Sequence, residues 1–232
     1  MCKTAISEWS YTKGPLGPEH WGELCASFTE AASFQWQSPI ALTSATKETT
    51  RDTLTFDYHS QEFDEIILNK TIHFVPKVFE NILTYQGEHY RLTDIHFHVP
   101  AEHLIDGKQE DMEFHLVHHN ERGEGLVVGI LYNIRTSDLG EEELVDIWNQ
   151  QKQTYRFDPT IWLPEVHSFY HYTGSLTTPP TLGPIKWFVL DHKKTIPATF
   201  FLPFTGRYEN PSNRPLQPLK ERTVFYYEGD EK

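Results

Sequence analysis

The chain has 232 residues, of which 38% are hydrophobic and 14% aromatic, and its formal net charge is −13. This length supports one sizeable core, and the composition does not shift along the chain, so we predict a single domain over residues 1–232. The acidic excess argues against nucleic-acid binding, which relies on clustered Lys and Arg, and no apolar run approaches the roughly 20 residues that a membrane-spanning helix needs.

The N-terminal segment lacks the charged start and apolar run of a signal peptide. We expect a cytoplasmic protein, with a secreted or lipid-anchored protein whose signal has been removed as the alternative. Cys2, directly after Met1, is consistent with the first residue of a mature lipoprotein. Cys2 and Cys25 can form at most one disulfide, and we favour a buried free thiol for Cys25.

Short β-rich runs punctuated by Pro and Gly predict a fold dominated by strands. In chain order, we expect strands at 65–68, 71–75, 94–99, 113–117, 126–134 and 187–190. Residues 138–153 predict a helix, because Asp138 can cap it and apolar residues follow at mostly helical spacing. The proline-rich and aromatic segment 197–218 predicts an extended stretch that wraps the surface. The fold class is therefore mainly β with helices as accessories.

Three histidines on two predicted strands are candidate metal ligands. His96 and His98 stand two apart in an alternating run, so both imidazoles share one face of a strand. His115 lies on a second alternating run and completes a three-nitrogen face if the two strands pair. Zn²⁺ is bound tetrahedrally by such nitrogens, and a catalytic site keeps the fourth position for water.

A lone His-X-His on a strand is more often a coincidence than a metal site, so the neighbouring residues decide the interpretation. Asp94 precedes His96 by two residues and Glu113 precedes His115 by two, which places each carboxylate on the face of a ligand. Carboxylates in such positions fix the tautomer and orientation of ligating imidazoles. Their presence favours a zinc site over a coincidence.

The sequence resembles the α-carbonic anhydrase family over nearly the whole chain. The motifs that carry the resemblance follow the family's order: Trp9-Ser10-Tyr11, Gly17-Pro18-Glu19-His20-Trp21, Gln37-Ser38-Pro39-Ile40, His96-Phe97-His98, Ala101-Glu102-His103, Glu113-Phe114-His115-Leu116-Val117-His118, Tyr172-Thr173-Gly174-Ser175-Leu176-Thr177-Thr178-Pro179-Pro180, Trp187, Asn213-Arg214-Pro215 and Gln217-Pro218-Leu219. The resemblance implies a large, twisted, mostly antiparallel central sheet with short peripheral helices.

The same resemblance implies a zinc enzyme that reversibly hydrates CO2 to bicarbonate and a proton through zinc-bound hydroxide. Carbonic anhydrase is itself the standard example of a zinc-bound water with a pKa of about 7. Thr177 matches the residue that accepts a hydrogen bond from the hydroxide and donates its own proton to a glutamate, matched by Glu102. Thr178 matches a pocket neighbour. The apolar CO2 site would be formed by Val117, Val127, Leu176, Ile185 and Trp187.

Three features depart from the family pattern. Asp94 stands where many members carry Gln. The position of the proton-shuttle histidine is occupied by Ile72 or Lys70, depending on the register. This leaves His73 as a candidate substitute shuttle or as a surface histidine without a role. Cys25 matches half of a disulfide found in secreted members, but its partner position is Thr181, so this bridge cannot form.

Two other function classes compete with the enzyme. A catalytically silent carbonic-anhydrase-like binding module would have lost zinc ligands, and a structural zinc protein would need a fourth protein ligand. All three histidines are present, and no Cys lies near them in the sequence. We do not expect His103 or His118 to be ligands, and we expect Arg214 to organise core carbonyls and carboxylates. A homodimer is a candidate assembly state.

Overall fold

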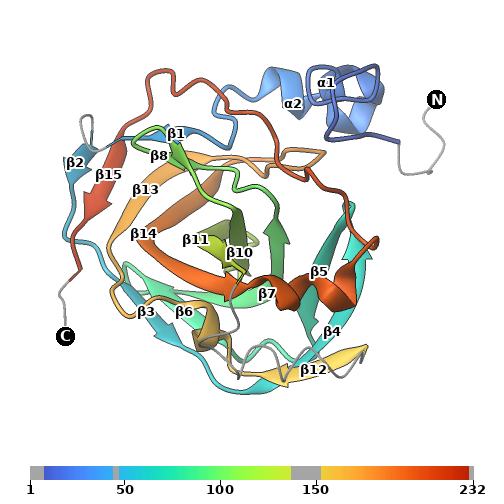
Figure 1. The fold of residues 1–232 in the computed structure, drawn as a ribbon. Coiled ribbons are helices and arrows are strands. Elements are labelled where there is room, and N and C mark those ends of the chain that lie inside the picture. Colours follow the sequence, from blue (N-terminus) through green and yellow to red (C-terminus); the bar gives the residue numbers. More distant parts are fainter. Residues whose placement is uncertain (1–7, 44–46, 137–152, 230–232) are drawn as a thin grey trace.

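A large, twisted, mixed sheet forms the centre of the molecule in the computed structural model, which describes residues 8–43, 47–136 and 153–229 (Figure 1). Within these residues the sheet has twelve strands. In spatial order, the main path runs through β12 (Thr154–Phe157), β4 (Gln61–Leu68), β5 (Thr71–Pro76), β7 (Glu88–His98), β10 (Met112–His119), β11 (Gly125–Arg135), β14 (Ile185–Pro197), β13 (Phe169–Gly174), β15 (Val224–Tyr227) and β2 (Lys47–Thr49). Beside this path, β6 (Ile82–Tyr85) pairs with β7 and with β3 (Leu54–Asp57).

Most of the ladders are antiparallel, whereas β11 pairs with β14 and β15 with β2 in parallel. A small second sheet contains β1 (Ala41–Leu42), β8 (Leu104–Ile105) and β9 (Lys108–Gln109). The helices are short and peripheral: α1 (Trp21–Leu24), η1 (Ala26–Phe28), α2 (Glu30–Ser33), η3 (Pro159–Trp162) and η4 (Ala198–Phe204). The predicted mainly β fold class is confirmed.

The two faces of the central strands carry different clusters because side chains alternate along a strand. On β7 and β10, Ile95 and Leu116 belong to the main core cluster. Val117 belongs to a second apolar cluster on the opposite face, with Val127 and Trp187 from the next strands. His96 and His115 share that opposite face, so the second cluster is the apolar surface nearest to them.

A bulge in β7 changes which residues share a face. Val117 pairs with Asp94, but the next residue, His118, pairs with Leu92, so Thr93 is an extra residue in the ladder. Because of this insertion, Leu92 and Ile95 both lie in the main core although they are three residues apart. On the N-terminal side of the bulge, the odd-numbered residues of β7 therefore lie on the same face as His96.

The predicted strands at 65–68, 71–75, 94–99, 113–117, 126–134 and 187–190 coincide with β4, β5, β7, β10, β11 and β14 to within a few residues. The predicted helix at 138–153 lies outside the described residues apart from Gln153. The prediction for 197–218 is wrong at its start. Residues Ala198–Phe204 form the 3₁₀ helix η4, because Phe200 and Phe204 are buried and pack against Phe97.

The N-terminal segment forms a separate aromatic cluster of Trp9, Tyr11, Trp21 and Phe28. Cys25 lies at the edge of this cluster. We expected it to be buried, but it is half-buried, with its Sγ 2.8 Å from the Ser27 hydroxyl. Across the described residues, no helix combines the length and apolar character that a bilayer crossing needs.

His118 gives the fold a predictable sensitivity to acid. Its ring is buried, and its Nε2 accepts a hydrogen bond from Tyr58. Burial lowers the pKa of His118 from 6.5 to about 3. The unfolded chain therefore binds a proton between pH 6.5 and 3 that the folded protein does not, so stability falls as the pH falls through this window.

We expect His118→Gln to remove this contribution, which has a slope of about 1.4 kcal/mol per pH unit below pH 6.5. The amide oxygen can still accept from Tyr58. Urea unfolding of both proteins between pH 4 and 8 measures the effect. The difference in unfolding free energy should be constant above pH 7 and change only below it, and parallel curves at all pH values would contradict the prediction.

Candidate metal centre

The three predicted ligands meet because β7 and β10 pair in an antiparallel register. His115 faces His96, and Glu113 faces His98, across adjacent strands. One nitrogen from each of His96, His98 and His115 lies within 4.8 Å of the others, and His98 and His115 are buried. The predicted convergence of the three imidazoles is confirmed by this register.

The outer nitrogen of each imidazole donates to an oxygen. His96 Nδ1 lies 2.6 Å from Asp94 Oδ2, and His98 Nδ1 lies 2.5 Å from the Ser212 carbonyl oxygen. His115 Nε2 lies 2.9 Å from Glu113 Oε1. Because these oxygens can only accept, all three rings hold their proton on the outside and direct a lone pair inward.

The inner nitrogens fit a tetrahedral zinc site. His115 Nδ1 and His96 Nε2 are 3.3 Å apart, and zinc–nitrogen bonds of about 2.0–2.1 Å at tetrahedral angles require a nitrogen–nitrogen distance of about 3.3–3.4 Å. Two lone pairs at this distance repel each other unless a cation lies between them. His98 Nε2 is buried and has no hydrogen-bond partner among the described residues. The three nitrogens therefore suit a metal ion.

The carboxylates behind the ligands stay ionised. Burial acts to raise the pKa of Asp94, but the His73 and His96 imidazoles outweigh it and hold that pKa below its ordinary value. Burial likewise opposes ionisation of Glu113, and the imidazoles of His103 and His115 again hold its pKa well below the usual range. Both carboxylates therefore remain available as acceptors at neutral pH.

The ligands themselves differ in their tendency to bind a proton. Burial lowers the pKa of His96 and of His98. Burial also disfavours protonated His115, but the Glu113 carboxylate outweighs it and raises the pKa of His115. Metal binding requires neutral imidazoles, so His115 is the ligand at which a proton competes with a metal most strongly as the pH falls.

Glu113 is the most heavily bonded group of the site. Its Oε2 accepts the backbone N–H groups of Glu102 and His103, and its Oε1 accepts from the rings of His103 and His115. A side chain on Gly129, which faces His115, would begin 2.6 Å from Glu113 Oε1. The glycine therefore leaves the space that this carboxylate occupies.

Thr177 and Glu102 are both buried, but the hydrogen bond we expected between them is not made within the described residues. Glu102 Oε1 accepts the backbone N–H of Arg214, and Oε2 has no hydrogen-bond partner. That oxygen lies 3.6 Å from His98 Nε2. Oε2 therefore remains available as an acceptor, and its hydrogen bond with the Thr177 hydroxyl stays a prediction.

The predicted apolar pocket residues come from neighbouring strands. Val117 pairs with Val127, and Val127 pairs with Trp187. Ile185 begins the same strand as Trp187, and Leu176 packs against this cluster. The Trp187 ring centroid is 4.9 Å from that of His115, so the apolar surface adjoins the ligands. Thr178 is half-buried in the loop after Leu176.

The placement of His73 disfavours the predicted proton shuttle. The residue is 4% exposed, and its ring stacks on that of His96 with centroids 4.4 Å apart. Its Nδ1 lies 2.9 Å from both Asp94 oxygens, and its Nε2 lies 2.8 Å from the Thr71 hydroxyl. Since both nitrogens are engaged and shielded from solvent, His73 is placed to hold Asp94 and not to exchange protons.

Several contributors to the site were missed by the sequence analysis. The Ser212 carbonyl oxygen belongs to the backbone, so no residue type indicates its role, although Ser212 directly precedes the Asn213-Arg214-Pro215 motif. His103 is not a ligand, as expected, but its Nδ1 donates to Glu113 and its Nε2 accepts from Tyr172. Arg214 donates to the Gln37 side chain and the Ser38 carbonyl, which confirms the predicted structural role.

Comparisons with known proteins agree over most of the chain. Residues 16–228 match the family model described as eukaryotic-type carbonic anhydrase. The carbonic anhydrase of Neisseria gonorrhoeae is 33% identical over 226 residues, which cover 94% of this chain and 88% of the relative. Dioscorin dioA3 of Dioscorea japonica is 32% identical and is covered to 89%, with 98% of this chain aligned.

Solved structures show the same two similarities. The alpha-carbonic anhydrase from Thermovibrio ammonificans, in complex with the inhibitor sulfanilamide, superposes with a TM-score of 0.85 at 30% identity, covering 95% of this chain and all of that one. Dioscorin complexed with ascorbate superposes with a TM-score of 0.85 at 29% identity, covering 97% of this chain and all of that one.

Proposed function

Because the chain belongs to the eukaryotic-type carbonic anhydrase family, we propose that it is a zinc-dependent enzyme that reversibly hydrates CO2 to bicarbonate. The observation that carries the proposal is the set of three inward lone pairs on His96, His98 and His115, each fixed by an outer acceptor. A bound Zn²⁺ supplies the Lewis acidity that makes water nucleophilic at neutral pH.

The residues of the chain supply position and polarity around that centre. The ionised Asp94 and Glu113 hold two of the ligands in the metal-binding tautomer. In this proposal, the Thr177 hydroxyl and Glu102 Oε2, which has no hydrogen-bond partner among the described residues, would orient the attacking oxygen. The apolar surface of Val117, Val127 and Trp187 beside His115 suits CO2, which has no charge to bind.

The alternative is a catalytically silent binding module. The chain is also similar to dioscorin, which has been solved in complex with ascorbate. The complete ligand set favours the enzyme. Metal analysis combined with stopped-flow CO2 hydration, before and after chelation, tests the proposal. We expect about one Zn²⁺ per chain, by the stoichiometry of one three-histidine site, and a rate that chelation removes and Zn²⁺ restores. A folded protein without a chelator-sensitive rate would refute it.

Asp94 should set the pH dependence of this activity. An anionic acceptor at His96 Nδ1 makes that imidazole a stronger electron donor, which weakens the Lewis acidity of a bound metal. We expect Asp94→Asn to move the midpoint of the pH–rate profile downward by roughly 0.5–1 pH unit. Profiles of both proteins measure the shift, with the exposed Glu165→Gln as control. A midpoint that is unchanged or higher in Asp94→Asn would contradict this expectation.

A further inference from the structure

His119 is a half-buried histidine on the metal-bearing face of the sheet. It ends β10, two residues after Val117 and four after His115, and alternation places all three on one face. Exposure increases along this face, because His115 and Val117 are buried, His119 is half-buried and Glu121 is exposed. His119 therefore lies between the metal site and solvent.

The hydrogen bonds of His119 identify its tautomer. The Thr93 hydroxyl donates its single proton to the Val117 carbonyl oxygen, 3.1 Å away. The same hydroxyl oxygen lies 3.0 Å from His119 Nδ1, so it can only accept there, and the ring carries its proton on Nδ1. His119 Nε2 consequently has an available lone pair. Thr93, the extra residue in β7, therefore fixes the tautomer of His119.

His119 Nε2 lies beside the apolar pocket wall. Gly125 pairs with His119 across β10 and β11. The position that a Cβ of Gly125 would occupy is 3.8 Å from His119 Nε2 and 2.5 Å from the Cδ1 of Ile185, a predicted pocket residue. The lone pair of His119 is thus near the surface that would bind CO2.

Burial and one nearby carboxylate act in opposite directions on the charge of His119. On β7, Arg91 is its partner in the ladder, but the Arg91 guanidinium donates to the Phe79 carbonyl oxygen. Burial lowers the pKa of His119, and the charge of Asp94 acts in the opposite direction. On β11 the paired residue is Gly125, which carries no charge.

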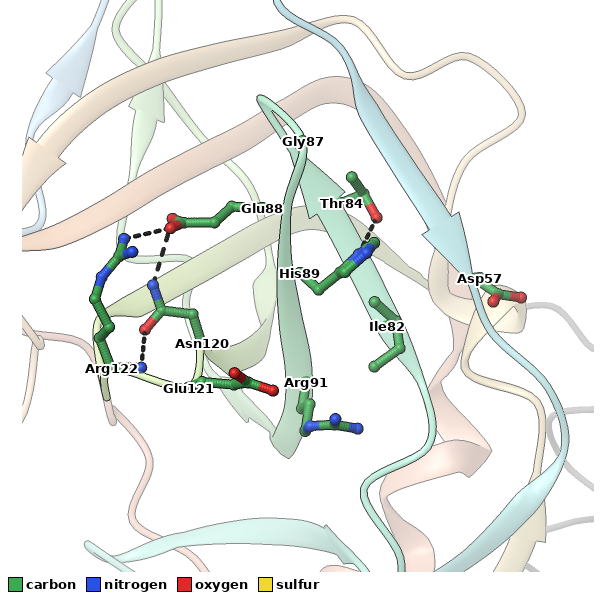
Figure 2. A pocket seen from close by; sticks show the side chains of 10 residues that line it. All are labelled: Asp57, Ile82, Thr84, Gly87, Glu88, His89, Arg91, Asn120, Glu121 and Arg122. Carbon is green, nitrogen blue, oxygen red and sulfur yellow. Dashed lines mark hydrogen bonds and ion pairs between the residues drawn. The ribbon is translucent and has the colours of Figure 1, made fainter.

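A cavity lies near the end of β10 that carries His119, although His119 is not among its lining residues. Its volume is about 600 Å³, and its lining includes Arg91, opposite His119, and Asn120 and Glu121, the next two residues of the chain. Figure 2 shows Arg91 and His89 projecting to one side of β7, and Glu88 projecting to the other side toward Asn120 and Arg122. A cavity of this size with polar lining residues can hold water molecules.

We propose that His119 is the proton acceptor of the reaction, with Nε2 receiving the proton through water and releasing it to buffer. Each hydration of CO2 yields one bicarbonate and one proton. The proton converts neutral His119 to the imidazolium, and its transfer from Nε2 to a buffer base regenerates the neutral ring, while Nδ1–H stays bonded to Thr93. This role rests on the proposed function.

The tautomer can be tested in the metal-free protein, independently of activity. Imidazole ¹⁵N NMR should show neutral His119 with its proton on Nδ1 and a titration midpoint below 6.5. Thr93→Val removes the acceptor and should increase the Nε2–H form. A wild-type ring that carries its proton on Nε2 would overturn the proposal.

The proton transfer can be tested by kinetics of the zinc-loaded protein. We expect His119→Ala to lower kcat at low buffer concentration by at least about tenfold. We expect kcat/KM to be unchanged and concentrated imidazole buffer to restore kcat. His192→Ala, which alters an exposed histidine on β14 away from this cavity, is the matched control and should behave as wild type.

The outcomes separate the two proposals. Zinc-dependent hydration at high buffer with an unaltered kcat of His119→Ala at low buffer would refute the role of His119 alone. No zinc-dependent hydration at any buffer concentration would refute the proposed function.

Discussion

Replacement of His98 by alanine is expected to abolish stable zinc binding and zinc-dependent CO2 hydration. His98 is fully buried, and its Nε2 is the inward nitrogen without a partner among the described residues. Without it, two protein ligands remain where a catalytic zinc site uses three. We expect zinc affinity to fall by at least about 10³-fold, more than the 10–100-fold typical for loss of an outer-shell partner, and hydration to fall correspondingly.

Zinc content after dialysis and stopped-flow hydration measure this effect, with His89→Ala as control. Because the alanine leaves the buried Ser212 carbonyl without its donor, at a cost of about 1–3 kcal/mol, folding must be verified by near-UV circular dichroism. His98→Gln is a second variant that can still donate to Ser212. A folded variant of either kind with stoichiometric zinc and the wild-type rate would show that His98 is not a ligand.

Thr177→Val should lower kcat/KM by about 10²-fold while zinc content stays unchanged. The substitution keeps the shape of the side chain and removes the hydroxyl that would accept from the attacking oxygen and donate to Glu102. Loss of orientation at a reacting group has an effect of this size. The buried Glu102 Oε2, which lacks a partner within the described residues, is the acceptor that such a relay needs.

Glu102→Gln tests the other half of the pair. Residues that act as one unit give non-additive effects, so the double variant should lose little more than Thr177→Val alone. Thr55→Val, on an exposed position of β3, is the control. Fully additive losses, or zinc loss in Thr177→Val, would argue against a relay and for a structural role of these residues.

Much of the site could be predicted because its signals are local. His96 and His98 share a face through the two-residue period of a strand, and Asp94 and Glu113 precede ligands by the same period. The family resemblance that motifs such as Glu113-Phe114-His115 indicated is confirmed by the family model and the relatives. These features depend on sequence spacing alone, which is why no coordinates were needed to find them.

The surroundings of His73 could not be predicted from local spacing. His73 is near the ligands in the structure, but the pairing of β5 with β7 places its ring against His96 and Asp94, and both nitrogens are used there. Sequence spacing cannot show which nitrogens are already bonded. The error at 197–218 arose because burial of Phe200 and Phe204 outweighs the proline content of the segment.

The sequence by itself therefore determined the fold class, the family and the three candidate ligands with their two carboxylates. Only the tertiary structure showed that the Ser212 carbonyl lies behind His98, that Gly129 leaves space for Glu113, and how the His119 ring is oriented. Each of these depends on strand register, on a single extra residue in β7 or on a backbone oxygen. Such contacts join residues far apart in the chain and have no signature in the residue types themselves.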